Sequence, residues 1–346
     1  METNVTDWIV VQCVLTDEER IIVSIMTILI TTTGLIGNAS VILSISLSKK
    51  LHTVCNTFIL NLCLADLLTC STGPLMAITY LQSVDELILP DIVCCSIGFL
   101  TISCIGCSVY SLASIAVNRL LHITSHNHLY RLVYTPFKIT LIIAFTWLVP
   151  IFMACLPPVF GMGRLGYDRR FSTCTWDPTH PLAAIYSMML SAVVYPISFI
   201  IIAISYSVIF CKVRQHSRVI RAVDINVSVT ESSGRDQSTN QVLAASGNLQ
   251  QNVSKRQVKV TRNMFLVVVC FLVCLTPYGA CLMAPNSDEF IVYAGQILLA
   301  NSFVNPIIYG TKHPDFKVVM RCVFRCRLRD VPEKTAFCKW LMCRWD

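Results

Sequence analysis

One carboxylate in this chain of 346 residues, that of Asp66, lies at an unusual position in the sequence. Asp66 is the only acidic side chain deep inside an apolar helical segment. A carboxylate in hydrocarbon is costly, so we expect Asp66 to face the interior of a helix bundle and to find polar partners there. Those partners can form a hydrogen-bonded cluster that needs no ion, or they can supply the oxygen ligands that a hard cation prefers.

The sequence shows no set of residues that is typical of a catalytic site. A membrane enzyme would need a paired carboxylate, a metal-binding set, or a nucleophile with its base. We find none of these, and therefore predict that the protein is not an enzyme.

The composition is typical of a membrane protein. Only 14% of the residues are charged and 54% are hydrophobic, with a mean hydropathy of +0.63. An ordinary soluble domain has about 25% charged residues. These values exclude a disordered chain, a collagen and a typical cytosolic enzyme. The net charge of +7 predicts no nucleic-acid partner, because in a membrane protein the position of the charges is what matters.

Seven stretches are apolar and long enough to cross a bilayer, which takes about 20 residues in a helix. They are Ile21–Leu47, Asn56–Leu81, Ile92–Ile123, Phe137–Gly161, Pro181–Cys211, Val258–Ala284 and Phe290–Gly310. The sequence thus predicts an all-α membrane protein, a seven-transmembrane helix bundle over residues 21–310 that follows an N-terminal segment, residues 1–20. Within the bundle domain, residues 212–257 predict a flexible loop, since Ser, Gln and Asn dominate its centre.

Lys and Arg residues predict the orientation. With the N-terminus outside, 23 of the 27 lie in inner segments and four in outer ones. The opposite orientation would break the positive-inside rule. We therefore expect a multi-pass protein of the plasma membrane with an extracellular N-terminus and a cytosolic C-terminus. In that orientation Asn4, in Asn4-Val5-Thr6, is a usable glycosylation site.

Motifs recur in nearly every apolar segment, in a consistent order and spacing. They are Gly37-Asn38, Asn61–Asp66, Asn118-Arg119-Leu120, Trp147 with Pro157-Pro158, Phe271 with Cys274–Pro277, and Asn301–Tyr309. As a set they resemble the rhodopsin-like (class A) G protein-coupled receptors. The stretches Asn118–Tyr134 and Gly161–Cys174 are similar to the trapped-in-endoderm and Moody group, and more distantly to the melatonin receptors.

The resemblance implies a role for the residues around Asp66. In the family these positions form a pocket for an allosteric sodium ion, and here every position is matched, by Asp66, Ser108, Asn301, Ser302 and Asn305. No other cofactor is expected.

The resemblance also implies coupling to a heterotrimeric G protein, with arrestin and receptor kinases as further partners. Arg119 would contact the G protein, and Pro277 would kink the sixth helix and provide its hinge. Asn118 cannot form the charged pair that an Asp would make with Arg119, which predicts a weaker inactive lock. The residues expected to act in coupling and activation are Asn118, Arg119, Tyr206, Phe271, Pro277, Asn305, Pro306 and Tyr309.

On the outer side, the resemblance implies a disulfide between Cys94 and Cys174. Thr101 stands where amine receptors carry an Asp, so we expect no monoamine ligand. The expected pocket is mostly apolar. Arg164, Arg169 and Arg170 in the loop above it either meet an anionic head group, which suits a small amphipathic or lipid-like ligand, or are ordinary solvated charges, and a peptide ligand stays open. The lining of the pocket would be Thr101, Ile105, Arg170, Tyr278, Leu282, Gly295 and Leu298.

The segment 311–346 predicts an amphipathic helix followed by a cytosolic tail. Apolar side chains recur at helical spacing after Tyr309 and basic ones fill the other face, which suits the lipids of the inner leaflet. Cys322 and Cys326 are candidate palmitoylation sites. Two alternatives stay open, a receptor-like protein that is constitutively active or non-signalling, and a transporter, which would place more polar residues inside the bundle.

Overall fold

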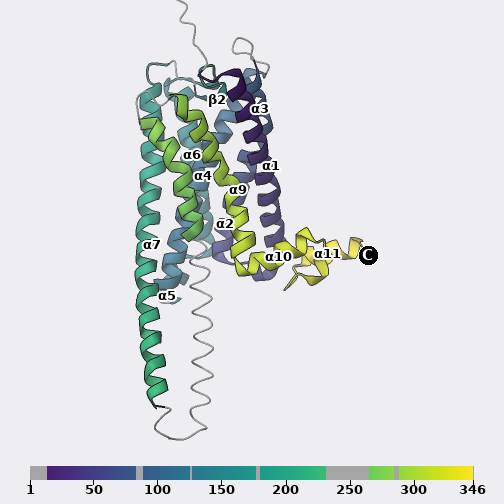
Figure 1. The fold of residues 1–346 in the computed structure, drawn as a ribbon, viewed down its shortest axis with the longest axis vertical. Helices are drawn as coiled ribbons and strands as arrows, with labels where there is room; N and C mark the ends of the chain where they lie inside the picture. The colour runs from purple at the N-terminus through teal and green to yellow at the C-terminus, as the bar shows by residue number, and fades with distance from the viewer. Residues whose placement is uncertain are drawn as a thin grey trace, which may run out of the picture.

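A computed structural model describes residues 14–82, 89–124, 127–176, 180–230, 265–283 and 288–345 of the chain. It is mostly helical (Figure 1). Seven of the described helices are long and apolar enough to cross a membrane. They are α1 (Asp17–Leu47), α2 with α3 (Val54–Ser71 and Gly73–Leu81), α4 (Asp91–Thr124), α6 (Pro136–Phe160), α7 (Ala183–Thr230), an unlabelled helix Phe265–Met283, and α9 (Asp288–Lys312). The predicted seven-helix bundle is confirmed.

The ends of these helices follow from local chemistry. Thr16 and Glu19 form a reciprocal capping box at the start of α1, which satisfies backbone N–H groups that have no helical partner. The Thr135 side chain caps α6 by accepting a hydrogen bond from the backbone N–H of Lys138, and Pro136 follows at the first position of the helix. Helix α6 ends at Gly161, where φ is +64°, a conformation that glycine adopts without a steric cost.

The second span, predicted as Asn56–Leu81, runs over Val54–Leu81 in the structure and is made of two helices. It consists of α2 and α3, with Thr72 at the junction. Pro74 follows directly, and a proline inside a helix removes a backbone donor and clashes with the preceding turn. Both pieces still form one span, Val54–Leu81.

Helix α4 is the central element of the bundle. It packs against α2, α6 and α7, while α1 packs against α2, α3 and α9. Large apolar side chains are exposed on the outside of the bundle, for example Leu29, Phe145 and Ile200. Buried polar side chains, in contrast, lie inside. This arrangement suits a bilayer, since hydrocarbon solvates apolar side chains.

Two features differ from the sequence-based expectations. Helix α7 continues to Thr230, so residues 212–230 of the predicted flexible loop are helical. This stretch contains neither Gly nor Pro, so nothing in it interrupts the helix that enters it. The loop between α6 and α7, which was predicted to lie on the outer side, forms an antiparallel hairpin of β1 (Leu165–Asp168) and β2 (Thr173–Trp176), which the all-α prediction did not include.

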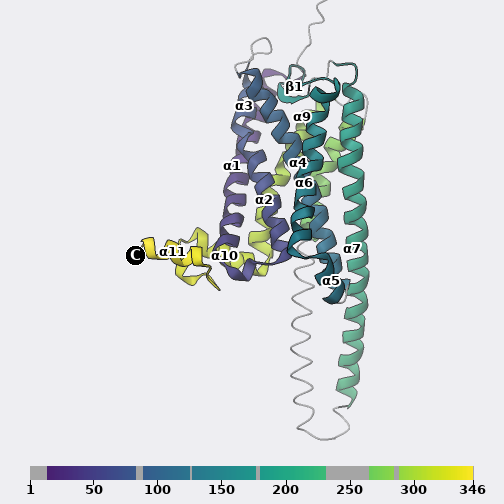
Figure 2. The ribbon, with the colours of Figure 1, turned by 180° about the vertical axis from the view of Figure 1, so that it is seen from behind.

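The end of the bundle opposite the β1–β2 hairpin carries short elements. Between the spans lie η1 (Lys49–Leu51) and α5 (Asn127–Val133), and after α9 come α10 (Pro314–Phe324), η2 (Leu328–Asp330) and α11 (Ala336–Trp345). The predicted amphipathic helix is α10, which buries Phe316, Val319 and Met320. In Figures 1 and 2, α10 and α11 extend sideways beyond α1, at the height where α1 ends.

Candidate functional site

Asp66 lies at the meeting point of α2, α4 and α9. Its side chain is buried, with 1% exposed. Ser108 of α4 and Ser302 of α9 donate hydrogen bonds to carboxylate oxygen Oδ1 at 2.8 and 3.2 Å. Asn305 donates to the other oxygen, Oδ2, at 3.1 Å. The expected polar cluster around the lone carboxylate therefore forms, and it joins three helices.

The donor set also fits a sodium ion. Asn301 lies one helical turn before Asn305 on α9, and the amide oxygens of both are buried without a hydrogen-bond partner. A buried acceptor without a partner is costly, and a hard cation prefers oxygen ligands together with negative charge. The hydrogen-bonded cluster offers one carboxylate, two hydroxyl oxygens and the amide oxygen of Asn305, and Asn301 lies one helical turn away.

Further polar contacts join the helices that surround the cluster. Asn38 of α1 donates from Nδ2 to the backbone oxygen of Ser302 at 2.8 Å. Asn61 of α2 accepts a hydrogen bond from Trp147 of α6 at 2.9 Å and donates to Ser111 of α4 at 2.8 Å. The motif residues Asn38, Asn61 and Trp147 thus position the helices that carry the cluster.

At the end of the bundle opposite the hairpin, Asn118 has a partner that the sequence did not predict. Its Nδ2 donates to the hydroxyl of Tyr130 in α5 at 3.1 Å. The ring of His122 lies edge-on to Tyr130, and Tyr134 packs against it. Burial raises the pKa of Tyr134 to about 12, so this phenol stays protonated at physiological pH. Neutral contacts therefore replace the charged pair that an Asp at position 118 would make.

The remaining residues that were predicted to act in coupling lie at several depths of the bundle. Arg119 is half-buried, and its Nε has no hydrogen-bond partner. Tyr206 and Tyr309 are buried, each with a hydroxyl that has no partner, so they do not bridge in this conformation. Phe271 is buried in the main core with both tyrosines. Pro277 and Pro306 lie inside their helices.

The outer hairpin is attached to the bundle by the predicted disulfide. Cys94 of α4 and Cys174 of β2 form it, across 80 residues of sequence. Gly98, one turn along α4, lies so close to β2 that a Cβ there would come within 2.8 Å of the backbone oxygen of Thr175. The hairpin therefore rests directly on α4 and covers the outer end of the bundle.

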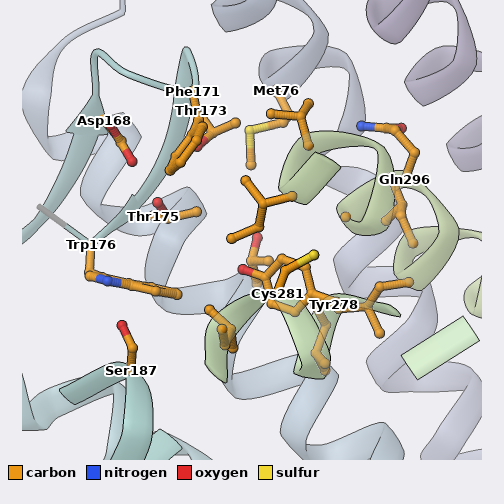
Figure 3. A pocket seen from close by; sticks show the side chains of 18 of the residues that line it. Met76, Asp168, Phe171, Thr173, Thr175, Trp176, Ser187, Tyr278, Cys281 and Gln296 are labelled. Carbon is orange, nitrogen blue, oxygen red and sulfur yellow. The ribbon is translucent and has the colours of Figure 1, made fainter. Parts of the chain in front are cut away.

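Under the hairpin is a cavity of about 530 Å³ (Figure 3). All seven residues that the sequence analysis expected to line a pocket do line it, namely Thr101, Ile105, Arg170, Tyr278, Leu282, Gly295 and Leu298. Among the described lining residues only Asp168 and Arg170 are charged, and both belong to the hairpin. The helical walls supply apolar groups, hydroxyls and one amide, that of Gln296.

The sequence predicted Arg170, which is exposed, as a lining residue of the pocket. It did not predict Asp168, which also lines the cavity and is 3% exposed. One oxygen of Asp168 accepts a hydrogen bond from the backbone N–H of Arg170 at 2.9 Å. The sequence did not predict Gln296 at the cavity either. Its side-chain amide contacts Thr27 at 3.0 Å and Tyr80 at 3.3 Å. These residues come from different helices or from a hairpin turn, so no local pattern brings them together.

The three candidate modification sites lie in different parts of the chain. Cys322 is half-buried in α10, and Cys326 is exposed just after it. Asn4 lies outside the described residues.

The seven helices, the carboxylate cluster and the roofed outer cavity define a membrane receptor of the seven-helix class. Residues 37–309 match the model of the 7 transmembrane receptor (rhodopsin family), and the chain belongs to this family of G protein-coupled receptors. The resemblance inferred from the motifs is confirmed. A family of receptors also agrees with the expectation that the protein is not an enzyme.

Two similar proteins come from Drosophila melanogaster. G-protein coupled receptor moody is 26% identical over 348 residues, which cover 88% of this chain and 51% of moody. Protein trapped in endoderm-1 is 26% identical over 305 residues, which cover 85% of this chain and 74% of that protein. The chain thus spans about half the length of moody. The fold is similar to that of squid rhodopsin, with a TM-score of 0.72 at 20% identity, over 92% of this chain and 88% of that one.

Proposed function

We propose that the chain carries a signal from a small amphipathic ligand in the outer cavity to a heterotrimeric G protein at the cytosolic ends of the helices. The observation that carries this proposal is the roofed cavity of about 530 Å³ with helical walls that hold no charged side chain among the described residues. Such walls suit an uncharged, mostly apolar ligand body, while the hydroxyls and Gln296 orient it. The two charged side chains of the hairpin, Asp168 and Arg170, line the same cavity.

Signalling of this kind rests on differential affinity. An agonist and a G protein that both prefer one conformation stabilise each other's binding. In this chain Arg119 and Asn118 stand at the cytosolic side, and the proline at 277 supplies a hinge for the Phe265–Met283 helix. Tyr206 and Tyr309, whose hydroxyls have no partner, are free to find one in the other conformation.

Sodium is the proposed allosteric ligand of the Asp66 cluster. Asp66, Ser108, Asn301, Ser302 and Asn305 would hold it, since they supply one negative charge and four neutral oxygens. A cation there would favour the conformation in which α2, α4 and α9 stay together around it.

The cellular setting follows from the charge distribution. We propose the plasma membrane, with the N-terminus and Asn4 outside and α10 on the inner leaflet, where Cys322 and Cys326 are accessible to acylation. Arrestin and receptor kinases are proposed partners of the same cytosolic surface.

The test is nucleotide exchange on purified G protein in the presence of the purified receptor, across all α-subunit classes and with a ligand screen that begins with lipids. Arg119→Ala should abolish the receptor-stimulated exchange. Arg131→Ala, which removes an exposed arginine in α5, is the matched control and should leave it unchanged. Exchange that is equal with and without Arg119 would contradict the proposal and favour a non-signalling protein.

One observation favours raised basal activity as a second possibility for the same function. The amide of Asn118 donates to the hydroxyl of Tyr130, and no Asp or Glu occurs in residues 237–287, which include the Phe265–Met283 helix. Neither the contact at Asn118 nor the Phe265–Met283 helix therefore offers Arg119 a negative charge that would hold it in the inactive conformation.

A further inference from the structure

The end of the chain returns to the first cytosolic loop. Four hydrogen bonds join residues 332–335 to residues 46–49. Two are between backbone groups, from the Lys49 N–H to the Glu333 oxygen at 2.8 Å and from the Thr335 N–H to the Leu47 oxygen at 3.0 Å. Two come from hydroxyls, from Ser48 to the Pro332 oxygen at 2.6 Å and from Thr335 to the Ser46 oxygen at 2.7 Å. We call this contact the tail clamp.

The clamp belongs to a packed substructure. Lys50 of η1 pairs with Asp315 of α10 at 3.1 Å, and Leu47, Leu51 and Val331 are buried between these elements. Thr335 also caps α11, since its Oγ1 accepts a hydrogen bond from the backbone N–H of Cys338 at 3.1 Å. The clamp therefore fixes where α11 begins.

Helix α11 has two different faces. Cys338 is fully buried, and Leu341 and Met342 are half-buried towards the rest of the tail. Phe337 and Trp340 are 43% and 55% exposed, and their rings stack with centroids 6.2 Å apart. The guanidinium of Arg344 lies 5.5 Å from the centroid of the Trp340 ring. The outer face of α11 thus presents aromatic rings beside a cation, and Lys339 is exposed next to them.

The position of this face points to its occupant. Figures 1 and 2 show α11 beside α10 and beyond α1, at the height where α1 ends, and on the opposite side of the bundle from α7. Apolar side chains of α1 such as Ile36 and Leu43 are exposed on its outside, so lipid surrounds α1 there. An element that extends sideways at that height meets the surface of the bilayer rather than the cytosolic centre of the bundle.

The charge of the tail suits an anionic lipid surface. Residues 314–346 contain eight Lys and Arg and four Asp and Glu. Basic side chains near a leaflet that contains acidic phospholipids are attracted to it, and tryptophan prefers the interface between water and hydrocarbon.

We propose that α11 is a second interfacial helix, held by the tail clamp against the membrane surface, where Phe337 and Trp340 enter the headgroup region and Lys339 and Arg344 bind anionic phospholipid. The leaflet is the inner one in the proposed orientation. The lipid contact itself does not depend on signalling and is measured without ligand or G protein.

The experiment uses the full-length receptor in phosphatidylcholine vesicles, with and without phosphatidylserine, whose acyl chains are brominated near the headgroup. The chain has five tryptophans, so the emission of Trp340 is obtained as the difference between the wild type and Trp340→Phe, which keeps an aromatic ring. We expect this emission to be quenched by brominated lipid, more strongly with phosphatidylserine, and to be shielded from acrylamide in water. Lys339→Gln combined with Arg344→Gln should remove the effect of phosphatidylserine.

The clamp is tested with Ser48→Ala combined with Thr335→Val, which removes both hydroxyl donors. The matched control is Ser46→Ala combined with Thr311→Val, two exposed hydroxyls that donate only within their own helices. We expect loss of lipid quenching in the first pair and none in the second. Quenching that is the same in both pairs would overturn the role of the clamp.

Two results would overturn the lipid proposal itself. In one, acrylamide reaches Trp340 in every vesicle and brominated lipid does not quench it. In the other, Trp340 becomes shielded only after a G protein is added, which would make α11 a protein-binding face. Neither result depends on whether Arg119 supports nucleotide exchange.

Discussion

At the scale of single residues, the polar exceptions inside the bundle are the informative ones. Asp66 was recognisable from the sequence because a carboxylate in an apolar segment must find partners. Its partners Ser108, Ser302 and Asn305 come from two other helices. The partner of Asn118, Tyr130, was not predicted, because a hydroxyl in a short helix between two spans has no distinguishing pattern.

Sodium should stabilise the purified receptor through Asp66. A ligand that binds only the folded state adds about 1.4 kcal/mol to the free energy of unfolding for each tenfold excess over Kd, which raises Tm by about 2–4 °C in a protein of this kind. We expect that rise with NaCl relative to an equal concentration of choline chloride, measured by thermal unfolding. Asp66→Asn should lose the rise, whereas Asp91→Asn, at an exposed position on α4, should keep it. Equal rises in both variants would rule out a sodium site at Asp66.

Asn118→Asp should lower basal activity. A carboxylate at this position can pair with Arg119, and a charge-assisted hydrogen bond is worth about 1.5–3 kcal/mol, or roughly tenfold or more in the conformational equilibrium. We expect basal nucleotide exchange to fall by about that factor. Tyr130→Phe, which removes only the hydroxyl that accepts from Asn118, should raise basal exchange. Unchanged rates in both variants would show that this contact does not control the inactive state.

At the scale of elements, close packing between the hairpin, α3 and α4 decides which segments line the cavity. The outer hairpin covers the cavity because Cys174 is joined to Cys94 and because β2 lies against Gly98 of α4. The break between α2 and α3 likewise brings Gly73, Met76 and Tyr80 to the cavity wall. Helix α4 therefore serves both ends of the receptor, with the hairpin at one end and Arg119 at the other.

Gly98→Ala should displace the hairpin. The added Cβ would meet the Thr175 backbone oxygen at 2.8 Å, which is a backbone atom that cannot rotate away, and overpacking of this kind costs about 1–3 kcal/mol. We expect a lower Tm and weaker ligand binding. Gly166→Ala, on β1, is the control, because a Cβ there has nothing within 4 Å. A Gly98→Ala receptor as stable as the Gly166→Ala receptor would show that β2 can move without loss.

At the scale of the whole molecule, charge and hydropathy separate the two ends. Basic residues gather at the side where α10 and α11 lie, and the carboxylate cluster lies between that side and the outer cavity. The +7 net charge is therefore not one basic surface. In the proposed orientation the inner side carries 23 Lys and Arg against seven Asp and Glu, the outer side carries four against 12, and Asp66 lies between them.

Glycosylation reports the proposed orientation. Asn4→Gln should remove the mobility shift that peptide-N-glycosidase produces in the receptor from cells, because only a sequon on the outer side is modified. Asn226→Gln and Asn252→Gln, in sequons that the same orientation places in the cytosol, should leave the shift unchanged. A shift that depends on Asn226 or Asn252 would reverse the orientation.

The sequence by itself determined the seven spans, the family, the expected pocket lining and the residues of the carboxylate cluster. The spans rest on local hydropathy and the family on motifs of fixed spacing, whereas the pocket lining and the partners of Asp66 rest on the resemblance to that family. Only the tertiary structure decided that Asp168 and Gln296 join the cavity, that Tyr130 pairs with Asn118, and that Thr335 returns to Leu47. These contacts join residues far apart in the chain or in separate elements, and ordinary polar side chains make them. Their positions depend on how helices pack, which hydropathy and motif spacing do not encode.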